Sequence, residues 1–240
     1  MRELINNKPK LICIPYAGGT ATSYQQLSTC LGEQWEIVVT DPPGHGSNTM
    51  PLIDNLESLV SYYLELYQEH FTSSFALFGY SMGGKIVHRM AQELEERDVH
   101  PLAVFISSMY SPNIVPQRLA HLEKNLFLKH LLSLGGIQKE LLEHEEFVNY
   151  FLPIIRADFK AVEEHLYENK HILNTPMHVF VGLQDERATP DSVHDWTKWA
   201  HQISFSYFDA GHMFLSEYAD LIAKKVNDVC ALKSDKVAIN

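Results

Sequence analysis

The sequence has few cysteines, few basic residues and no long apolar run near its amino terminus, and each shortage excludes a class of protein. Its three cysteines form no CxxC pair, and an odd number cannot pair fully within one chain, so we expect free thiols in a reducing compartment. The 19 basic residues face 30 acidic ones, and a formal charge of -11 repels nucleic acid and anionic membranes. The first apolar stretch, LICIPY (11–16), is too short for a signal peptide or a membrane span, which predicts a cytoplasmic protein.

Motifs for metals and for bound phosphate are also missing. The histidine- and glutamate-rich segments contain neither HExxH nor an EF-hand pattern, so we predict no metal site. The AGG stretch at 17–19 lacks both the GxGxxG spacing and the lysine of a P-loop, so we predict no nucleotide cofactor.

What the chain does contain is an alternation of apolar runs and helical segments. With 240 residues, it is long enough for one large α/β domain. Continuously apolar runs predict strands that are covered on both faces, and helices between them predict a mostly parallel sheet. The six predicted strands are 11–16, 36–41, 75–80, 102–108, 177–182 and 203–209, and the helical segments are 23–31, 56–71, 83–96, 191–200 and 214–231. Functional residues are expected at the carboxyl ends of such strands.

The alternation stops between residues 111 and 175. This segment is predominantly helical by pattern and contains no strand-like run, so it has no sheet of its own. We therefore predict a single domain over residues 1–240, in which about 111–175 form a helical cap over the active site.

A serine lies between glycines at the end of the third apolar run. The segment FALFGYSMGGKIVHRMA (75–91) combines a strand, a G-x-S-x-G turn and an amphipathic helix, which is typical of a nucleophile elbow. The glycines allow the backbone to pass close to its neighbours and present the hydroxyl at a helix amino terminus. Ser81 is therefore the predicted nucleophile.

A serine nucleophile needs a base and an orienting carboxylate, in the chain order Ser, acid, His for this kind of fold. His212, in FDAGHMFL, directly follows the last apolar run and is the predicted base. Asp185, in GLQDER, follows the preceding run and is the favoured acid. Glu186 beside it and Asp209 at the end of the last run remain alternatives.

Acyl transfer also requires two backbone N–H donors for an oxyanion. Met82, which follows the nucleophile, and Ala17, in the loop after the first apolar run, are the predicted donors. The loop TDPPGHGSN (40–48) reaches the same edge of the sheet, and there His45 either lines the cleft or stabilises the loop by a hydrogen bond.

Taken together, IPYAGGTATSY, DPPGHG, FGYSMGG, FLPIIRADF, GLQDE and DAGHMFL resemble the type II (editing) thioesterases associated with nonribosomal peptide and polyketide synthetases. The resemblance implies an α/β-hydrolase fold with a helical lid, and hydrolysis of acyl groups from the phosphopantetheine arm of carrier proteins. It also implies a Ser81, His212 and Asp185 triad, with no cofactor beyond the arm that the substrate carries. Tyr80 stands where many relatives have histidine, and we expect this difference to affect the pocket wall.

The resemblance also implies acidic carrier proteins as partners, and a chain of charge -11 cannot attract them through its overall field. We therefore expect a local docking surface on the cap, and a trans-acting monomer. The candidate residues for this surface are Arg118, Lys124, Lys129, Arg156 and Lys160, with Phe127 as an apolar neighbour.

Two other functions remain open. A general carboxylesterase would use the same triad on small free esters. A hydrolase-fold protein that only binds a partner would not react with a serine-directed fluorophosphonate.

Overall fold

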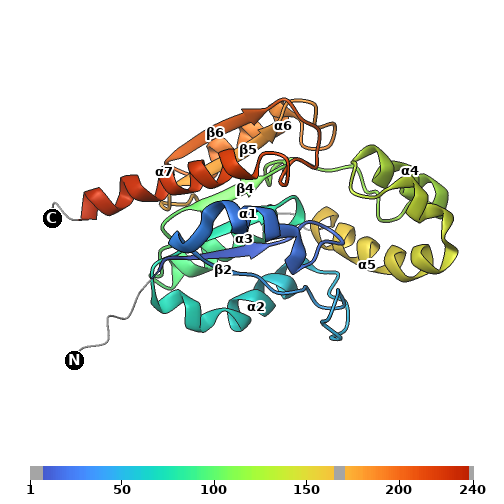
Figure 1. Ribbon diagram of the computed structural model, residues 1–240, viewed down its shortest axis with the longest axis horizontal. Helices are drawn as coiled ribbons and strands as arrows, with labels where there is room; N and C mark the ends of the chain where they lie inside the picture. Colours follow the sequence, from blue (N-terminus) through green and yellow to red (C-terminus); the bar gives the residue numbers. More distant parts are fainter. Residues whose placement is uncertain (1–7, 165–170, 238–240) are drawn as a thin grey trace.

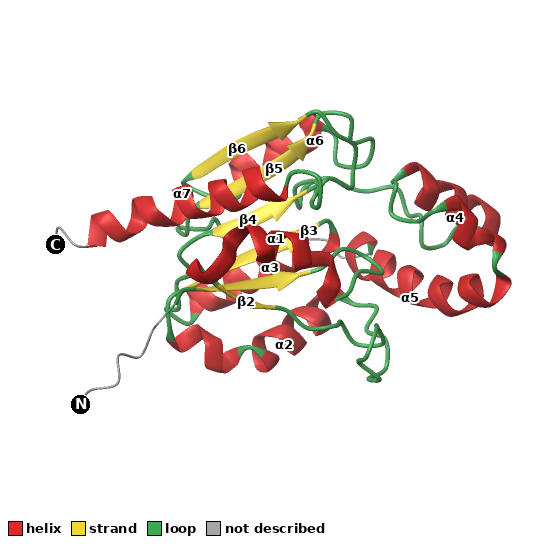
Figure 2. Ribbon diagram, in the orientation of Figure 1, coloured by secondary structure: helices red, strands yellow, loops and turns green. Residues whose placement is uncertain are grey.

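The computed structural model describes residues 8–164 and 171–237, and its centre is a parallel sheet with the strand order β2-β1-β3-β4-β5-β6 (Figures 1 and 2). All neighbouring strands pair in parallel. The strands are β1 (Lys10–Ile14), β2 (Glu36–Val38), β3 (Phe75–Tyr80), β4 (Val104–Ser107), β5 (Met177–Gly182) and β6 (Ile203–Phe208). All six predicted strands are thus confirmed, and the α/β class with them.

The α-helices in this part of the chain are α1 (Gln25–Leu31), α2 (Leu56–Leu66), α3 (Met82–Glu96), α4 (Lys124–Ser133), α5 (Glu145–Glu163), α6 (Pro190–His194) and α7 (Ala219–Val237). The predicted start of the last helix at residue 214 is wrong, because α7 begins at Ala219. Phe214 and Leu215 lie in the loop before it, and they are buried there without belonging to a helix.

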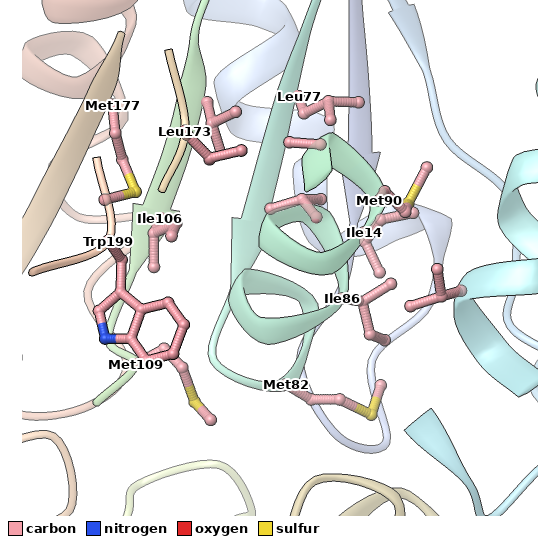
Figure 3. Packing of buried hydrophobic residues seen from close by; sticks show 14 of the residues in the cluster. Ile14, Leu77, Met82, Ile86, Met90, Ile106, Met109, Leu173, Met177 and Trp199 are labelled. Atoms are coloured by element: carbon pink, nitrogen blue, oxygen red, sulfur yellow. The ribbon is translucent and has the colours of Figure 1, made fainter. Parts of the chain in front are cut away.

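Alternate residues of the strands build two cores, one on each face of the sheet. On β3, Leu77 joins a cluster with α2 and α3, whereas Ala76 and Phe78 join a cluster with α1 and α7. Figure 3 is a close view of the cluster that contains Leu77, in which Ile86 and Met90 of α3 pack near side chains from the strands. Burial on both faces explains why the strands are apolar continuously along the chain.

The segment between β4 and β5 carries α4 and α5, which lie beyond the carboxyl ends of the strands (Figure 1). These helices form a third apolar cluster that includes Phe127, Leu131, Ile155 and Phe159. Pro153 lies inside α5 and removes one backbone hydrogen bond from that helix. The carboxyl ends of the strands and these two helices therefore face each other.

Candidate active site

Ser81 lies on a sharp turn between β3 and α3. Its backbone has φ 50° and ψ -116°, a conformation that non-glycine residues rarely adopt. The turn is closed by hydrogen bonds on both sides, since Ser81 N–H donates to the Ser107 carbonyl at 2.8 Å and Gly84 N–H donates to the Ser81 carbonyl at 2.8 Å. The surrounding structure thus holds Ser81 in a strained conformation at the start of a helix.

The two glycines of the motif make this turn possible by allowing close backbone contacts. A Cβ added to Gly79 would lie 2.1 Å from the Gly83 carbonyl oxygen, and one added to Gly83 would lie 2.0 Å from the Ile14 carbonyl oxygen. Both neighbours are backbone atoms, which cannot rotate away as a side chain can. The G-x-S-x-G pattern is therefore a packing requirement of β1, β3 and α3.

His212 and Asp185 meet Ser81 at the carboxyl ends of the strands. His212 Nε2 lies 3.0 Å from Ser81 Oγ, and His212 Nδ1 lies 2.8 Å from Asp185 Oδ2. Both partners are largely buried, with 8% of His212 and 3% of Asp185 exposed. The three residues form one continuous chain of hydrogen bonds, as expected for a nucleophile, a base and an orienting acid.

The geometry also separates Asp185 from the alternative acids. Its second oxygen, Oδ1, accepts hydrogen bonds from the N–H groups of Arg187 and Ala188, each at 2.9 Å. Burial raises the pKa of Asp185, but the bond and charge of His212 and these two N–H groups outweigh burial, so the pKa lies below its usual value. Glu186 and Asp209 are both exposed, and Asp209 accepts from Gln184 instead.

The predicted oxyanion donors lie on two sides of Ser81. Met82 is the first residue of α3, where backbone N–H groups have no partner within the helix. Ala17 lies in a turn closed by a 2.8 Å hydrogen bond from Gly19 N–H to the Tyr16 carbonyl. Ala17 and Ser81 line the same pocket.

That pocket is small and mostly apolar. Its volume is about 40 Å³. A single buried water needs about 10–15 Å³, so the space accommodates a group of only a few heavy atoms. The sheet side supplies Tyr16, Ala17, Ser81, His212 and Met213, and the helical segment supplies Leu131, Leu134, Gly136, Ile137, Ile155 and Phe159.

Asp158 of α5 joins the helical segment to two loops of the sheet edge. Its Oδ2 accepts from Gly18 N–H at 2.7 Å and lies 2.9 Å from His45 Nε2, while His45 Nδ1 lies 2.9 Å from the Pro43 carbonyl. Both nitrogens of His45 thus face acceptors, which favours the imidazolium form. Of the two predicted roles for His45, the structure supports the stabilisation of the loop. Asp158 belongs to the segment FLPIIRADF, but no pattern in the sequence indicates its role.

The end of α5 is held by a second buried group of charges. Glu163, 3% exposed, accepts from Arg187 Nη2 at 2.7 Å and from Ala120 N–H at 2.9 Å. Lys85 of α3, 1% exposed, donates to the Val162 carbonyl at 2.8 Å, and burial followed by the charge of Arg187 lowers its pKa to about 8. These contacts tie α5 both to the helix that follows Ser81 and to the loop that carries Asp185.

The predicted docking surface is wrong at two positions. Phe127 is 0% exposed and packs edge to face on Phe159 inside the third cluster. Arg156 is directed inward, because its guanidinium donates to the carbonyls of Ala120 and Leu122 and lies over the Phe127 ring. Lys160 pairs with Asp54 at 2.6 Å and remains accessible.

The expectation for Tyr80 also needs correction, because it is 0% exposed and so does not form a pocket wall. Within residues 8–164 and 171–237, no group of three or more His, Cys, Asp or Glu side chains is placed to hold a metal ion. None of the helices in this part of the chain combines the length and apolar character that a membrane span requires.

Comparison with known proteins gives one consistent result. A family model described as "Thioesterase domain" matches residues 9–230. The chain is 26% identical over 228 residues to Thioesterase PikA5 of Streptomyces venezuelae, a match covering 93% of this chain and 81% of that protein. It is 29% identical over 215 residues to the gramicidin S biosynthesis protein GrsT of Aneurinibacillus migulanus, covering 88% of this chain and 84% of that protein.

Among solved structures, the thioesterase RedJ from the prodiginine biosynthetic pathway in Streptomyces coelicolor superposes with a TM-score of 0.87 and 26% identity, covering 93% of this chain and 91% of RedJ. The parallel sheet, the serine turn at the end of β3 and the histidine after β6 together make this an α/β-hydrolase fold. Because the family model covers nearly the whole described chain, the protein belongs to the thioesterase family.

Proposed function

We propose that the protein hydrolyses acyl groups from the phosphopantetheine arm of carrier proteins, and so removes misprimed or stalled units from nonribosomal peptide or polyketide synthetases. The observation that carries this proposal is the Ser81–His212–Asp185 chain of hydrogen bonds beneath a small apolar pocket, in a chain of the thioesterase family. Relatives named for gramicidin S biosynthesis and as the thioesterase PikA5 support the association with such synthetases.

The proposed reaction proceeds through an acyl-enzyme. His212 Nε2 accepts the proton of Ser81 as its Oγ attacks the thioester carbonyl, and the thiol leaves from the tetrahedral intermediate with a proton returned by His212. Water, activated by the same nitrogen, then attacks the acyl-serine and releases the free acid. Asp185, held in its ionised form by its hydrogen bonds, orients His212 and stabilises the imidazolium formed in each half.

The N–H groups of Met82 and Ala17 are proposed to stabilise the oxyanion of both intermediates. An oxyanion donor of this kind contributes about 10²- to 10³-fold to the rate. The pocket beside Ser81 accommodates a short acyl group in the arrangement of the helices seen here, so acetyl is the first substrate to test.

In this proposal the whole chain acts as one domain, with about 111–175 as the cap over the active site. The six cap residues of the pocket support this assignment, since they close the space above Ser81. The proposed enzyme is a cytoplasmic monomer without a cofactor, and its partner is the acyl or peptidyl carrier protein. The accessible basic candidates for a docking surface are Arg118, Lys124, Lys129 and Lys160.

The test compares one acyl group in three settings: acetyl on a phosphopantetheinylated carrier protein, acetyl on free pantetheine, and acetyl in a small oxygen ester. We expect the highest kcat/KM for the carrier thioester, and no hydrolysis by Ser81→Ala. Equal or faster turnover of the oxygen ester would indicate a general carboxylesterase. If a fluorophosphonate failed to label Ser81, a non-catalytic binding protein would be the better description.

A further inference from the structure

The residue that acts as the base lies in a loop without regular secondary structure. β6 ends at Phe208 and α7 begins at Ala219, so His212 has no strand or helix of its own to fix its backbone. A general base must keep its nitrogen within hydrogen-bond reach of the nucleophile. Contacts from elsewhere in the chain must therefore position this loop.

Tyr80, the residue before Ser81, supplies two of these contacts. Its hydroxyl donates to the His212 carbonyl at 2.6 Å and accepts from Phe214 N–H at 2.8 Å. The side chain reaches from β3 in the interior of the sheet to the loop after the edge strand β6, across 132 residues of sequence. The pKa of a tyrosine lies far above neutral pH, and burial raises that of Tyr80 further, so the hydroxyl keeps its proton as a donor.

Ser108 supplies a third contact to the same point. Its hydroxyl donates to the His212 carbonyl at 2.9 Å and lies 3.3 Å from the Tyr80 oxygen. Ser108 is 1% exposed and has φ 49°, a left-handed conformation that is costly for a residue other than glycine. Ser108 and Ser81 are two of three non-glycine residues with positive φ in the described chain. The strained backbone of Ser108 places its hydroxyl against the loop 209–218, which carries His212 and is called the histidine loop below.

These hydrogen bonds close a ring around the reacting groups. Ser81 follows Tyr80 directly, Ser81 Oγ lies 3.0 Å from His212 Nε2, and the His212 carbonyl returns to the Tyr80 hydroxyl. The two hydroxyl donors use both lone pairs of that carbonyl. Ser81, the proposed nucleophile, and Tyr80, which holds the loop of the proposed base, are thus adjacent in the chain.

We propose that Tyr80 and Ser108 are positioning residues of the hydrolase, whose hydroxyls fix the His212 backbone so that its imidazole stays in line between Ser81 and Asp185. This inference rests on the proposed function, because it assigns a task to groups that act through His212. Neither hydroxyl touches the substrate.

Simple filling of the core does not account for the Tyr80 hydroxyl. The ring already packs edge to face on Tyr16 and Phe214, with centroid distances of 5.9 and 5.7 Å. A phenylalanine would keep those ring contacts and lose the two hydrogen bonds to the histidine loop, together with the contact to the Ser108 hydroxyl. Tyr80→Phe therefore separates packing from positioning.

The matched control is Tyr67→Phe. Tyr67 directly follows α2 and is also buried, with 2% exposed. Its hydroxyl bonds to Thr40 Oγ1 at 2.9 Å and not to the histidine loop. Both variants lose a buried phenolic hydroxyl. We expect only Tyr80→Phe, and not Tyr67→Phe, to lower kcat and to change the His212 signal.

The experiment measures kcat and KM for an acetyl thioester, the rate of Ser81 labelling by a fluorophosphonate, and the low-field NMR signal of the His212 Nδ1 proton. For Tyr80→Phe we expect kcat and the labelling rate to fall about 10- to 100-fold with KM little changed, because small displacements of reacting groups have effects of this size. The low-field signal should shift or broaden. Ser108→Ala should lower kcat in the same way but less, and it tests the proposal if Tyr80→Phe does not fold.

The outcomes separate this proposal from the proposed function. An active wild-type enzyme whose Tyr80→Phe variant keeps its kcat and its low-field signal refutes the positioning role alone. An equal fall in kcat for Tyr67→Phe also refutes it, since loss of any buried hydroxyl would then suffice. A wild-type chain that neither hydrolyses thioesters nor reacts with the fluorophosphonate would refute the triad, and the positioning role with it.

Discussion

Substitution of Gly83 by alanine tests the tightest contact of the serine turn. The added Cβ would lie 2.0 Å from the Ile14 carbonyl oxygen, whereas real Cβ contacts essentially never fall under 3.0 Å. The backbones of β1 and α3 would therefore have to separate by at least 1.0 Å, the difference between 3.0 and 2.0 Å. Alanine favours a helix over glycine by about 1 kcal/mol. Overpacking of this kind costs about 3 kcal/mol, so the steric effect should win.

The same displacement would reach the active site, because Gly83 lies two residues after Ser81 on the turn. A misplacement of about 1 Å lowers kcat by about 10²-fold. We expect Gly83→Ala to lose about 2 kcal/mol in the free energy of urea unfolding, the net of the helix and steric effects, and about 10²-fold in thioester hydrolysis.

The control is Gly211→Ala, which also lies beside a site residue but whose added Cβ meets no atom within 4 Å. Its unfolding free energy should change by less than about 1 kcal/mol. If Gly83→Ala were as stable and as active as Gly211→Ala, the close contact between β1 and α3 would not be the reason for glycine at position 83.

Three further predictions concern charged groups of the site and its supports. Asp185→Asn should fold normally but lower kcat by about 10⁴, because an amide does not hold His212 in the required tautomer; near-normal kcat would mean that another acid orients the histidine. Burial lowers the pKa of His45, but the bond and charge of Asp158 more than offset burial, so the pKa is raised. The stability that this pair contributes is therefore complete below about pH 6.5 and lost at higher pH, and the difference in unfolding free energy between wild type and Asp158→Asn should shrink as the pH rises above about 6.5. A constant difference would contradict the ion pair. Lys85, with its pKa lowered to about 8, penalises folding while it is charged. Relative to Lys85→Met, the wild type should gain up to about 3 kcal/mol of stability as the pH rises from about 8 to about 10.4, and parallel pH curves for the two proteins would refute this.

The strands could be predicted from the sequence because both faces of the sheet are covered. Each strand therefore appears as a short continuous apolar run, and six such runs became six strands. Apolar residues before α7 misled the prediction, since Phe214 and Leu215 are buried from a loop rather than from a helix. Burial alone does not reveal which backbone conformation delivers a side chain to the core.

The meeting of Ser81, His212 and Asp185 could also be predicted, because strand ends of a parallel sheet meet at one edge and the expected chain order leaves few candidates. The residues that hold these three in place could not be predicted from the sequence. Asp158 bonds to Gly18 over 140 residues, and Tyr80 bonds to His212 over 132. No local pattern marks such partners, since each contact exists only after the sheet has formed.

The surface of the helical segment between β4 and β5 was predicted least well, and for the same reason. Arg156 and Phe127 look like a basic and an apolar surface residue in the sequence, yet Phe127 is buried and the half-buried Arg156 packs over its ring. A basic side chain whose guanidinium caps backbone carbonyls is not available to a partner. Charge counting on a helix does not distinguish these two situations.

The position of β6 at the edge of the sheet predicts how the enzyme loses its activity on heating or in denaturant. Among the described residues, the strand before His212 lies at the edge of the sheet and pairs with β5 alone; Asp185 follows β5 itself, whereas Ser81 follows the interior strand β3. Edges of a fold open locally at lower free energy than its centre. Mild heat or denaturant that detaches β6 would displace His212, the proposed base, while most of the secondary structure persists. Inactivation is therefore expected to precede global unfolding, and recovery of activity on refolding would report the pairing of a single strand.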